Sequence, residues 1–223
     1  MSTAREPRFT LDHVELYVPD RVSAAAWYAR VLGCEPVGGT ESWATDPEGP
    51  MMISPDGGRT KLALFTGEAG RTKQAIGFLG DGLRPGTVCF YMSTPTLRTD
   101  VLAHLEKSRP SLRADIAEGR LVLAEYIPSP AGQLEYWDTR MRAALGAGAH
   151  SFRVVGDLRG FGPNGSDEGL SEYEAGYEEL IAKRFPVVTL CQYDVRYFSG
   201  ITILNTLRLH RDNFRYPAER FLG

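Results

Sequence analysis

One continuous stretch constrains the fold of this chain more than any other, residues 61–94 (KLALFTGEAGRTKQAIGFLGDGLRPGTVCFYMST). An apolar run at 62–65 enters a glycine-containing turn, and a helix-like amphipathic segment follows at 73–80. A second apolar run, 88–92, ends in a polar cluster. A strand, a loop, a helix and a strand in this order predict one βαβ unit, in which the two strands are parallel.

The remainder of the chain continues this alternation of strands and helices. The runs 88–92 and 187–190 are apolar throughout, which is typical of a parallel sheet that is covered on both faces. The pattern therefore predicts an α/β fold with a mostly parallel sheet and helices on both faces. The further segments that it predicts are a helix at 97–107, a polar connection at 113–119, a strand at 121–126, a helix at 133–145, a strand at 152–155, an acidic helix at 168–183, a helix at 201–209 and a short strand at 214–216.

The residues in front of this block have a different order of elements. Residues 12–18 alternate between apolar and polar, which predicts a half-buried strand. Asp20 is a candidate N-cap for a helix that ends at Gly33. The pattern predicts a βαβββ module at 1–66 and an α/β domain at 67–223, and the strand 62–65 could belong to either. The short strands expected in the module are 35–37, 42–45 and 51–54, followed by a turn at 55–58 and the strand 61–65.

Composition excludes several classes of protein. The 223 residues are 43% hydrophobic and 24% charged with a net charge of −3, which is ordinary for a globular protein. Because there is no block of Lys and Arg, we expect no direct contact with nucleic acid. No apolar run approaches the roughly 18 residues that span a bilayer, and no signal peptide precedes the fold, so we expect a cytoplasmic protein without membrane contact. The three cysteines are too widely spaced for a disulfide framework, and Cys89 and Cys191 lie in apolar runs.

The segment 67–74 is a degenerate form of the Walker A phosphate loop. A functional loop reads GxxxxGK[ST], where backbone N–H groups surround the phosphates and the Ser or Thr hydroxyl binds magnesium. Gly67, Gly70 and Lys73 fit this pattern. Thr72 replaces the glycine before the lysine, and a β-branched residue resists the backbone angles that glycine permits. Gln74 replaces the hydroxyl residue and is a poor ligand for magnesium.

The second element of such a site is an apolar strand that ends in Asp, and FRVVGD, which ends at Asp157, fits it. In ATPases, the corresponding Asp orients the metal ion. No Glu lies beside it to activate water, so we expect a vestigial site without ATPase activity and without a resident cofactor. Two alternatives remain at 67–74, namely a nucleotide that is bound but not hydrolysed, and a turn that binds no ligand.

The front module resembles the vicinal oxygen chelate superfamily, the group of glyoxalases, bleomycin-resistance proteins and ring-cleaving dioxygenases. LDHVELYVPD, AAWYARVLGCEPV and GPMMISPDGGRTKLALF carry the resemblance. It implies a metal ligand on the first strand, where His13 stands, and a Glu on the last strand, where this chain has Ala63. It also implies two modules per active site, which a homodimer would supply. The alternatives for His13 are a metal ligand and an ordinary strand histidine, because a metal needs several converging donors.

The second block resembles the MEDS domain, a sensory domain of DcmR-type regulators and a derived relative of the KaiC/RecA-like ATPases. The resemblance runs from about residue 65 to 217, and FPVVTLCQYDVRYFS followed by ILNTLRLH is its most specific part. It implies a RecA-like fold, loss of ATPase activity, and binding of a small ligand such as a hydrocarbon derivative. It also implies a regulatory protein partner. Since the sequence contains no helix-turn-helix or kinase motif, we expect the output to come from a separate protein.

A ligand in an open parallel sheet binds beyond the carboxyl ends of the strands. The alternative interpretation of the polar residues there is helix capping and local ion pairing. The residues that we predict for the ligand site are Gly67, Gly70, Thr72, Lys73, Glu125, Tyr126, Asp157, Arg159, Gln192, Tyr193, Asp194 and Arg196.

The sequence thus favours a non-catalytic sensory or regulatory module that binds a small organic ligand. The alternative is a metal-dependent enzyme of the glyoxalase or dioxygenase type, which would act through a dimer of the front module and His13. A third hypothesis is that the acidic helix 168–183 docks a basic protein partner. The alternative is that this helix presents an ordinary solvated face and binds no partner.

Overall fold

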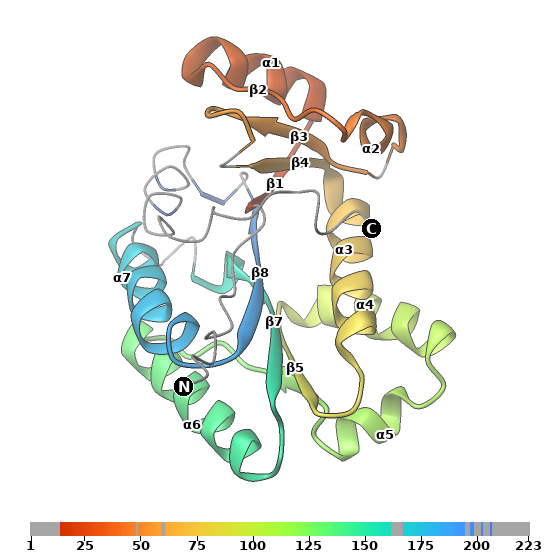
Figure 1. Cartoon of the computed structure of the whole chain (residues 1–223), viewed down its shortest axis with the longest axis vertical. Helices are drawn as coiled ribbons and strands as arrows, with labels where there is room; N and C mark the ends of the chain where they lie inside the picture. Colours follow the sequence, from red (N-terminus) through yellow and green to blue (C-terminus); the bar gives the residue numbers. More distant parts are fainter. Residues whose placement is uncertain are drawn as a thin grey trace, which may run out of the picture.

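A computed structural model describes residues 14–47, 49–58, 61–161, 167–194, 197, 198, 202 and 206 of the chain. The strands in this part of the chain form one sheet in the order β2-β3-β4-β1-β8-β7-β5-β6 (Figure 1). Their bounds are β1 Val14–Val18, β2 Glu35–Pro36, β3 Met51–Ser54, β4 Leu62–Thr66, β5 Thr87–Met92, β6 Leu121–Ala124, β7 Ser151–Asp157 and β8 Val187–Asp194.

Seven α-helices are found in the same ranges, together with a 3-10 turn and a π-helical turn. Their bounds are α1 Arg21–Leu32, α2 Glu41–Thr45, α3 Gly67–Gly82, α4 Pro95–Ser108, α5 Leu112–Ala117, α6 Pro130–Gly146 and α7 Asp167–Tyr177, with η1 (3-10) at Leu158–Phe161 and η2 (π) at Glu178–Ala182.

The sheet is mostly parallel. β4, β1, β8, β7, β5 and β6 run parallel to their neighbours, whereas β2 and β3 form an antiparallel edge that continues onto β4. Helices cover both faces (Figure 1). One face packs against α1, α6 and α7, and the other against α3, α4 and α5. The α/β class and the helices on both faces are therefore confirmed.

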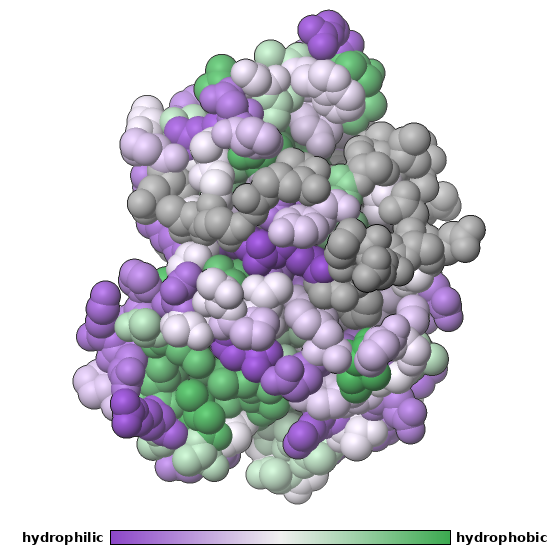
Figure 2. All heavy atoms as spheres, turned by 180° about the vertical axis from the view of Figure 1, so that it is seen from behind, coloured by the Kyte–Doolittle hydropathy of each residue, from purple (hydrophilic) through white to green (hydrophobic). Residues whose placement is uncertain are grey.

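The core follows from this layering. Trp137 of α6 is fully buried and meets the ring of Phe90 edge to face at 5.6 Å, on the face that α7 also covers. On the other face, Leu79 of α3 and Val101 of α4 are fully buried. Seen from behind, hydrophobic residues gather in the lower half of the molecule and hydrophilic residues surround them (Figure 2).

The local signals around the first helix are confirmed. The Asp20 carboxylate accepts the backbone N–H of Ser23 at 2.6 Å, so Asp20 caps α1. Gly33 ends the helix in the left-handed region, with φ 66°. The hairpin turn at 55–58 follows β3 as predicted, with Gly57 and Gly58 both at positive φ.

Two local predictions were wrong, and one predicted helix is confirmed with a change of type. Residues 42–45 form helix α2 and not a strand, because Trp43 packs beneath the apolar cluster of Tyr17 and Phe65. The polar connection at 113–119 contains helix α5, in which Leu112 and Asp115 are buried. The acidic helix changes to a π-helical turn at 178, and Glu174 is completely buried. It is therefore not a uniformly solvated acidic face.

The alternation of apolar and polar residues predicted a half-buried first strand, and this prediction was wrong. Leu16 and Val18 are buried on one face of the sheet, and Tyr17 is buried at 3% exposure on the other. The reason is that β1 lies in the middle of the sheet, between β4 and β8, and is parallel to both.

The strand at 62–65 pairs with the front strands on both sides. β4 is antiparallel to β3 and parallel to β1, and no strand of the later block is its neighbour. The front strands join the later ones through the pairing of β1 with β8. The division of the chain into units at 1–66 and 67–223 and the RecA-like relationship stay predictions.

Candidate functional site

Two buried carboxylates end neighbouring strands at one edge of the sheet. Asp157 is the last residue of β7, and Asp194 is the last residue of β8. Both side chains are completely buried. Parallel strands bring their carboxyl ends to the same edge, so these residues lie where an open α/β sheet holds ligands.

A fully buried arginine from α3 neutralises this edge. Arg71 Nη1 donates to Asp157 Oδ1 at 3.3 Å and lies 3.9 Å from Asp194 Oδ2. The Arg71 guanidinium also lies over the ring of Tyr17, 5.3 Å from its centre. The guanidinium of Arg71 therefore lies in the protein interior, where it pairs with two carboxylates.

Arg159 closes the cluster from the rim. Its Nη2 donates to Asp157 Oδ2 at 2.9 Å, and its Nη1 lies 3.7 Å from Asp194 Oδ2. Nη2 also reaches the hydroxyl of Thr94 at 3.4 Å, and the guanidinium lies 5.7 Å from the ring centre of Tyr197. The Arg159 side chain keeps 12% of its surface exposed, so it is the part of the cluster that a solute can reach.

Gln192 ties the cluster to the centre of the sheet. Its amide Nε2 donates to the hydroxyl of Tyr17 at 3.1 Å and to the backbone carbonyl of Arg71 at 3.2 Å. The side chains of Arg71, Arg159, Asp157 and Asp194, which we call the strand-end cluster, carry two positive and two negative formal charges. Isolated charges are costly to bury, and the opposite charges of the four groups compensate this cost.

The predicted phosphate loop is not a loop. α3 begins at Gly67, directly after β4, so residues 67–74 form the first two turns of a helix. The intervening residues are good helix formers, which extend the helix back to the strand. Lys73 extends outward and pairs with Asp46 at 2.9 Å, with about half of its side chain exposed. Thr72 is partly exposed and Gly70 is buried.

The other predicted site residues fall into three groups. Asp157, Arg159, Gln192 and Asp194 come together, and the hydroxyl of Tyr126 donates to the backbone carbonyl of Asp157. Glu125 does not join them, because its side chain is 78% exposed and pairs with Arg98 at 2.7 Å. The residues that lie outside the described residues are Arg196 and His13.

Tyr193 points to the opposite face of the sheet. Its hydroxyl donates to Glu174 Oε1 at 2.5 Å, and burial raises the pKa of Tyr193 well above its usual range. Trp137 donates its indole N–H to the hydroxyl of Tyr173 at 2.9 Å in the same region. CQYD is part of β8 and not a loop beyond it, so its residues alternate between two buried polar clusters.

Sequence reasoning missed Arg71, Tyr17 and Glu174. One signal could have found Arg71. It lies four residues before Ala75 and eight before Leu79, and all three are fully buried on one helix face. For Tyr17 the pattern suggested a solvent-facing position, because nothing in it shows that β1 is a central strand.

The described residues include neither a metal-binding cluster nor a membrane-spanning helix. Within the described ranges, no three His, Cys, Asp or Glu side chains come together in a way that could hold a metal ion. Ala63, at the position of the second ligand in the superfamily, is fully buried and offers no donor atom. In the described part of the chain, no helix has the length and apolar character needed to cross a lipid bilayer.

Comparison with known proteins defines the class. The model of MEDS, the methanogen/methylotroph, DcmR sensory domain, matches residues 61–211. The chain belongs to this family.

A particular relative is the transcriptional repressor DcmR of Methylorubrum extorquens (strain DSM 6343 / CIP 106787 / DM4). It is 32% identical over 156 residues, which make up 70% of this chain and 59% of the repressor. The chain therefore spans about three fifths of the length of this relative. Membership of this family assigns the chain to a class of sensory domains.

Proposed function

We propose that this protein is a non-catalytic ligand sensor that reports the binding of a small organic molecule to a separate output protein. Membership of a sensory-domain family supports the role, and the similarity to a transcriptional repressor supports the regulatory output. The ligand binds at the carboxyl ends of the strands, at the rim formed by Arg159, Thr94 and Tyr197.

The observation that carries this proposal is the strand-end cluster. Charged groups fill the place where an open α/β sheet holds ligands, and Arg71 supplies the positive charge that pairs with the two buried carboxylates. A ligand that pairs with Arg159 competes with Asp157 and Asp194 for the same guanidinium. The resulting rearrangement reaches α3, β7 and β8 together, which gives the domain two discrete arrangements.

A thermal-shift screen with matched variants tests the proposal. The screen contains nucleotides, short halogenated or methylated compounds, and aromatic compounds. We expect one class to raise the melting temperature of the wild type, because a ligand that binds only the folded state stabilises it. Arg159→Gln is expected to lose this shift. Arg113→Gln, which alters an exposed arginine paired with Glu106, is expected to keep it.

Two outcomes of the thermal-shift screen would contradict the proposal. If no class of compound shifts the melting temperature, the chain is not a sensor of these molecules. If Arg159→Gln and Arg113→Gln respond alike, the ligand binds away from the strand ends.

We also infer that the ligand is a hydrocarbon derivative and that the fold descends from a RecA-like ATPase that has lost its activity. Both inferences rest on the family resemblance together with the absence of a hydroxyl residue after Lys73. The expectations of a cytoplasmic location and of no direct nucleic-acid contact stay predictions, as does the relationship of residues 1–66 to the vicinal oxygen chelate superfamily.

A further inference from the structure

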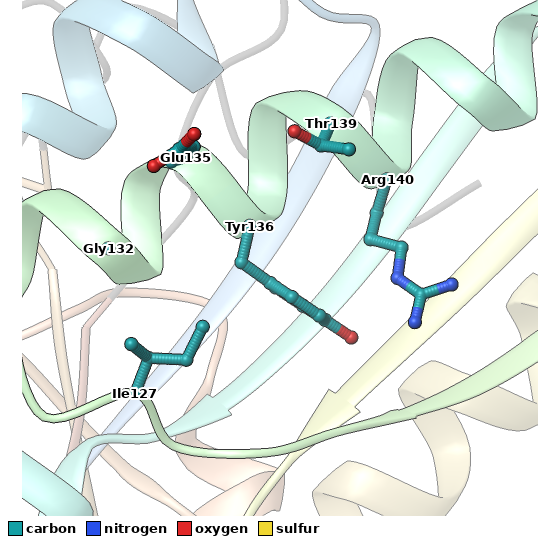
Figure 3. A pocket seen from close by; sticks show the side chains of 6 residues that line it. All are labelled: Ile127, Gly132, Glu135, Tyr136, Thr139 and Arg140. Carbon is teal, nitrogen blue, oxygen red and sulfur yellow. The ribbon is translucent and has the colours of Figure 1, made fainter.

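A groove of about 410 Å³ lies beside α6, next to the segment that follows β6 (Figure 3). Its volume falls in the range of small-molecule sites. The residues that line it are Ile127, Gly132, Glu135, Tyr136, Thr139 and Arg140. None of them belongs to the strand-end cluster.

The groove combines an aromatic wall with a cation. Figure 3 shows Tyr136 and Arg140 extending from the same side of α6 toward the segment that contains Ile127. The Arg140 guanidinium lies 5.4 Å from the centre of the Tyr136 ring. Among the described residues, no carboxylate forms an ion pair with Arg140. Arg142, two residues later, differs because it holds Asp138 through two hydrogen bonds of 2.6 and 3.0 Å.

The apolar wall of the groove is held in place. The Gln133 side chain is completely buried, and its Oε1 accepts the backbone N–H of Ile127 at 2.8 Å. A side chain at Gly132 would come within 2.9 Å of Ile127 Cγ2 and 2.8 Å of Ser129 Oγ, so glycine lets α6 begin close to this segment. The hydrogen bond to Gln133 and the close approach at Gly132 join Ile127 to the start of α6, so a displacement of one moves the other.

We propose that this groove binds a small organic carboxylate with a flat, apolar body. Arg140 receives the carboxylate, because a planar guanidinium matches the two carboxylate oxygens. The body of the ligand lies between the Tyr136 ring and Ile127. This inference goes beyond the proposed function, because it assigns a second site, away from the rim of Arg159, Thr94 and Tyr197, together with the class of molecule that the second site binds.

The groove connects to the strand-end cluster through one residue. Tyr126 precedes Ile127 and donates its hydroxyl to the backbone carbonyl of Asp157. A ligand that shifts Ile127 also shifts Tyr126, and with it the carbonyl of the residue that pairs with Arg71 and Arg159. Occupancy of the groove thereby changes the arrangement of β7.

Titration with benzoate, followed by the amide resonances of the ¹⁵N-labelled full chain, tests the inference. We expect saturable shifts at Ile127 and along residues 132–140, followed by smaller shifts at Asp157. Arg140→Gln is expected to weaken binding by about tenfold or more, since a charged hydrogen bond is lost. Arg142→Gln, on the same helix but outside the groove, is expected to bind benzoate as the wild type does. Benzamide, which has the same shape but no charge, is expected to bind the wild type about tenfold more weakly.

Three results would overturn the inference. These are the absence of saturable shifts up to about 10 mM benzoate, equal binding by wild type and Arg140→Gln, and equal binding of benzamide and benzoate. Because Arg140 is exposed, its substitution leaves the fold intact, and the dispersion of the amide spectrum verifies this.

The two proposals fail in distinguishable ways. If carboxylates do not bind but another class of compound raises the melting temperature through Arg159, the groove inference is wrong and the sensory function stands. If benzoate binds through Arg140 but no compound raises the melting temperature through Arg159, the groove inference stands and the proposed strand-end site is wrong. If benzoate binds without shifting the Asp157 resonance, the connection between the groove and the strand-end cluster is wrong.

Discussion

Arg71 is, after Trp137, the largest side chain that is fully buried among the described residues. An arginine is rarely enclosed unless its charge is balanced, and here two carboxylates and an aromatic ring surround it. Its partners come from the ends of two strands. The side chain thus holds α3 against β7 and β8 at the edge where the ligand is proposed to bind.

We expect Arg71→Met to lower the free energy of unfolding by roughly 3–5 kcal/mol, because Asp157 and Asp194 lose a buried cationic partner. Urea denaturation measures this change. Lys73→Met, which removes an exposed pair with Asp46, is the control and is expected to change stability by less than about 1 kcal/mol. Equal stabilities for the two variants would show that the buried charges do not depend on Arg71.

The three cysteines are buried and form no disulfide with one another, and their chemistry follows from that position. Burial raises the pKa of the Cys89 thiol from 9.0 to about 12, a difference of about three pKa units. We expect Cys89 to react with a disulfide reagent at pH 8 only after unfolding, since the thiolate is the reactive form. Comparing the reaction in buffer and in guanidinium chloride measures this, and rapid native labelling of Cys89 would contradict it.

The same shift predicts a dependence of stability on pH. The folded thiol holds its proton more tightly than the unfolded thiol, so the contribution of Cys89 to stability is complete below pH 9.0. It is then lost as the pH rises from there toward about 12. Cys89→Ala is expected to show a shallower loss of stability over this interval.

At the scale of elements, β8 separates two polar clusters. Gln192 and Asp194 face Arg71 and Tyr17, whereas Tyr193 faces Glu174 on the other side. The strand therefore connects the face covered by α3 with the face covered by α7. A displacement of the end of β8 would therefore change the packing of the helices on both faces of the sheet.

The buried carboxylate of Asp115 stabilises the connection between α5 and β6. Asp115 is buried and accepts from Arg109 Nε at 2.5 Å, Arg120 Nε at 2.7 Å and the Ser111 hydroxyl at 3.2 Å. These hydrogen bonds, above all the one from Arg109, lower the pKa of Asp115. Asp115→Asn is expected to lower the free energy of unfolding by roughly 2–4 kcal/mol.

The acid sensitivity of the wild type follows from the same group. Because the pKa of Asp115 is lower in the folded protein, its stabilisation is complete above the ordinary value of 3.8 and is lost as the pH falls below it. The advantage of the wild type over Asp115→Asn should therefore shrink as the pH falls below 3.8 in urea titrations. Asp138→Asn, which alters a surface pair with Arg142, is the control and is expected to differ from wild type by less than about 1 kcal/mol. An unchanged advantage at low pH would contradict the role of Asp115.

The sequence predicted most of these elements but not their neighbours in space. Apolar runs located β5, β7 and β8, and the signals at Asp20 and Gly33 bounded α1. The ends of β7 and β8 were placed too early, because Asp157 and Asp194 are polar residues inside the ladder that are stabilised by Arg71 and Arg159. Such compensation comes from residues far apart in the chain, so no local pattern reveals it.

At the scale of the whole molecule, the strands of the described residues form a single sheet in which a strand from the front of the chain is central. β1 makes backbone pairs with β4 on one side and β8 on the other. The family match begins at residue 61, so β1 lies outside the matched segment but between two strands that belong to it. The front residues therefore contribute to the stability of the sensory domain.

We expect the front segment and the later block to unfold in one cooperative transition. Leu16→Ala should lower the free energy of unfolding by roughly 2–5 kcal/mol, because Leu16 is fully buried in the central strand. Labelling of Cys34 in the front segment and the fluorescence of Trp137, in a variant whose other two tryptophans are replaced by phenylalanine, should report the same urea midpoint. Val22→Ala, at an exposed position of α1, is the control and is expected to have little effect. Two separate midpoints would show that the front segment folds independently.

The position of β1 has a practical consequence for anyone who isolates the sensory segment by its family boundaries. Neighbouring strands lie about 4.8 Å apart, so removing residues 1–60 would leave β4 and β8 separated by roughly 9.6 Å, with unpaired backbone groups facing an empty slot. Because β3 also lies within residues 1–60, β4 would lose its other neighbour as well, and the three open edges, two on β4 and one on β8, invite pairing with strands of other molecules. A fragment that begins at residue 61 is therefore expected to aggregate, whereas a fragment that begins before Val14 keeps its edges covered.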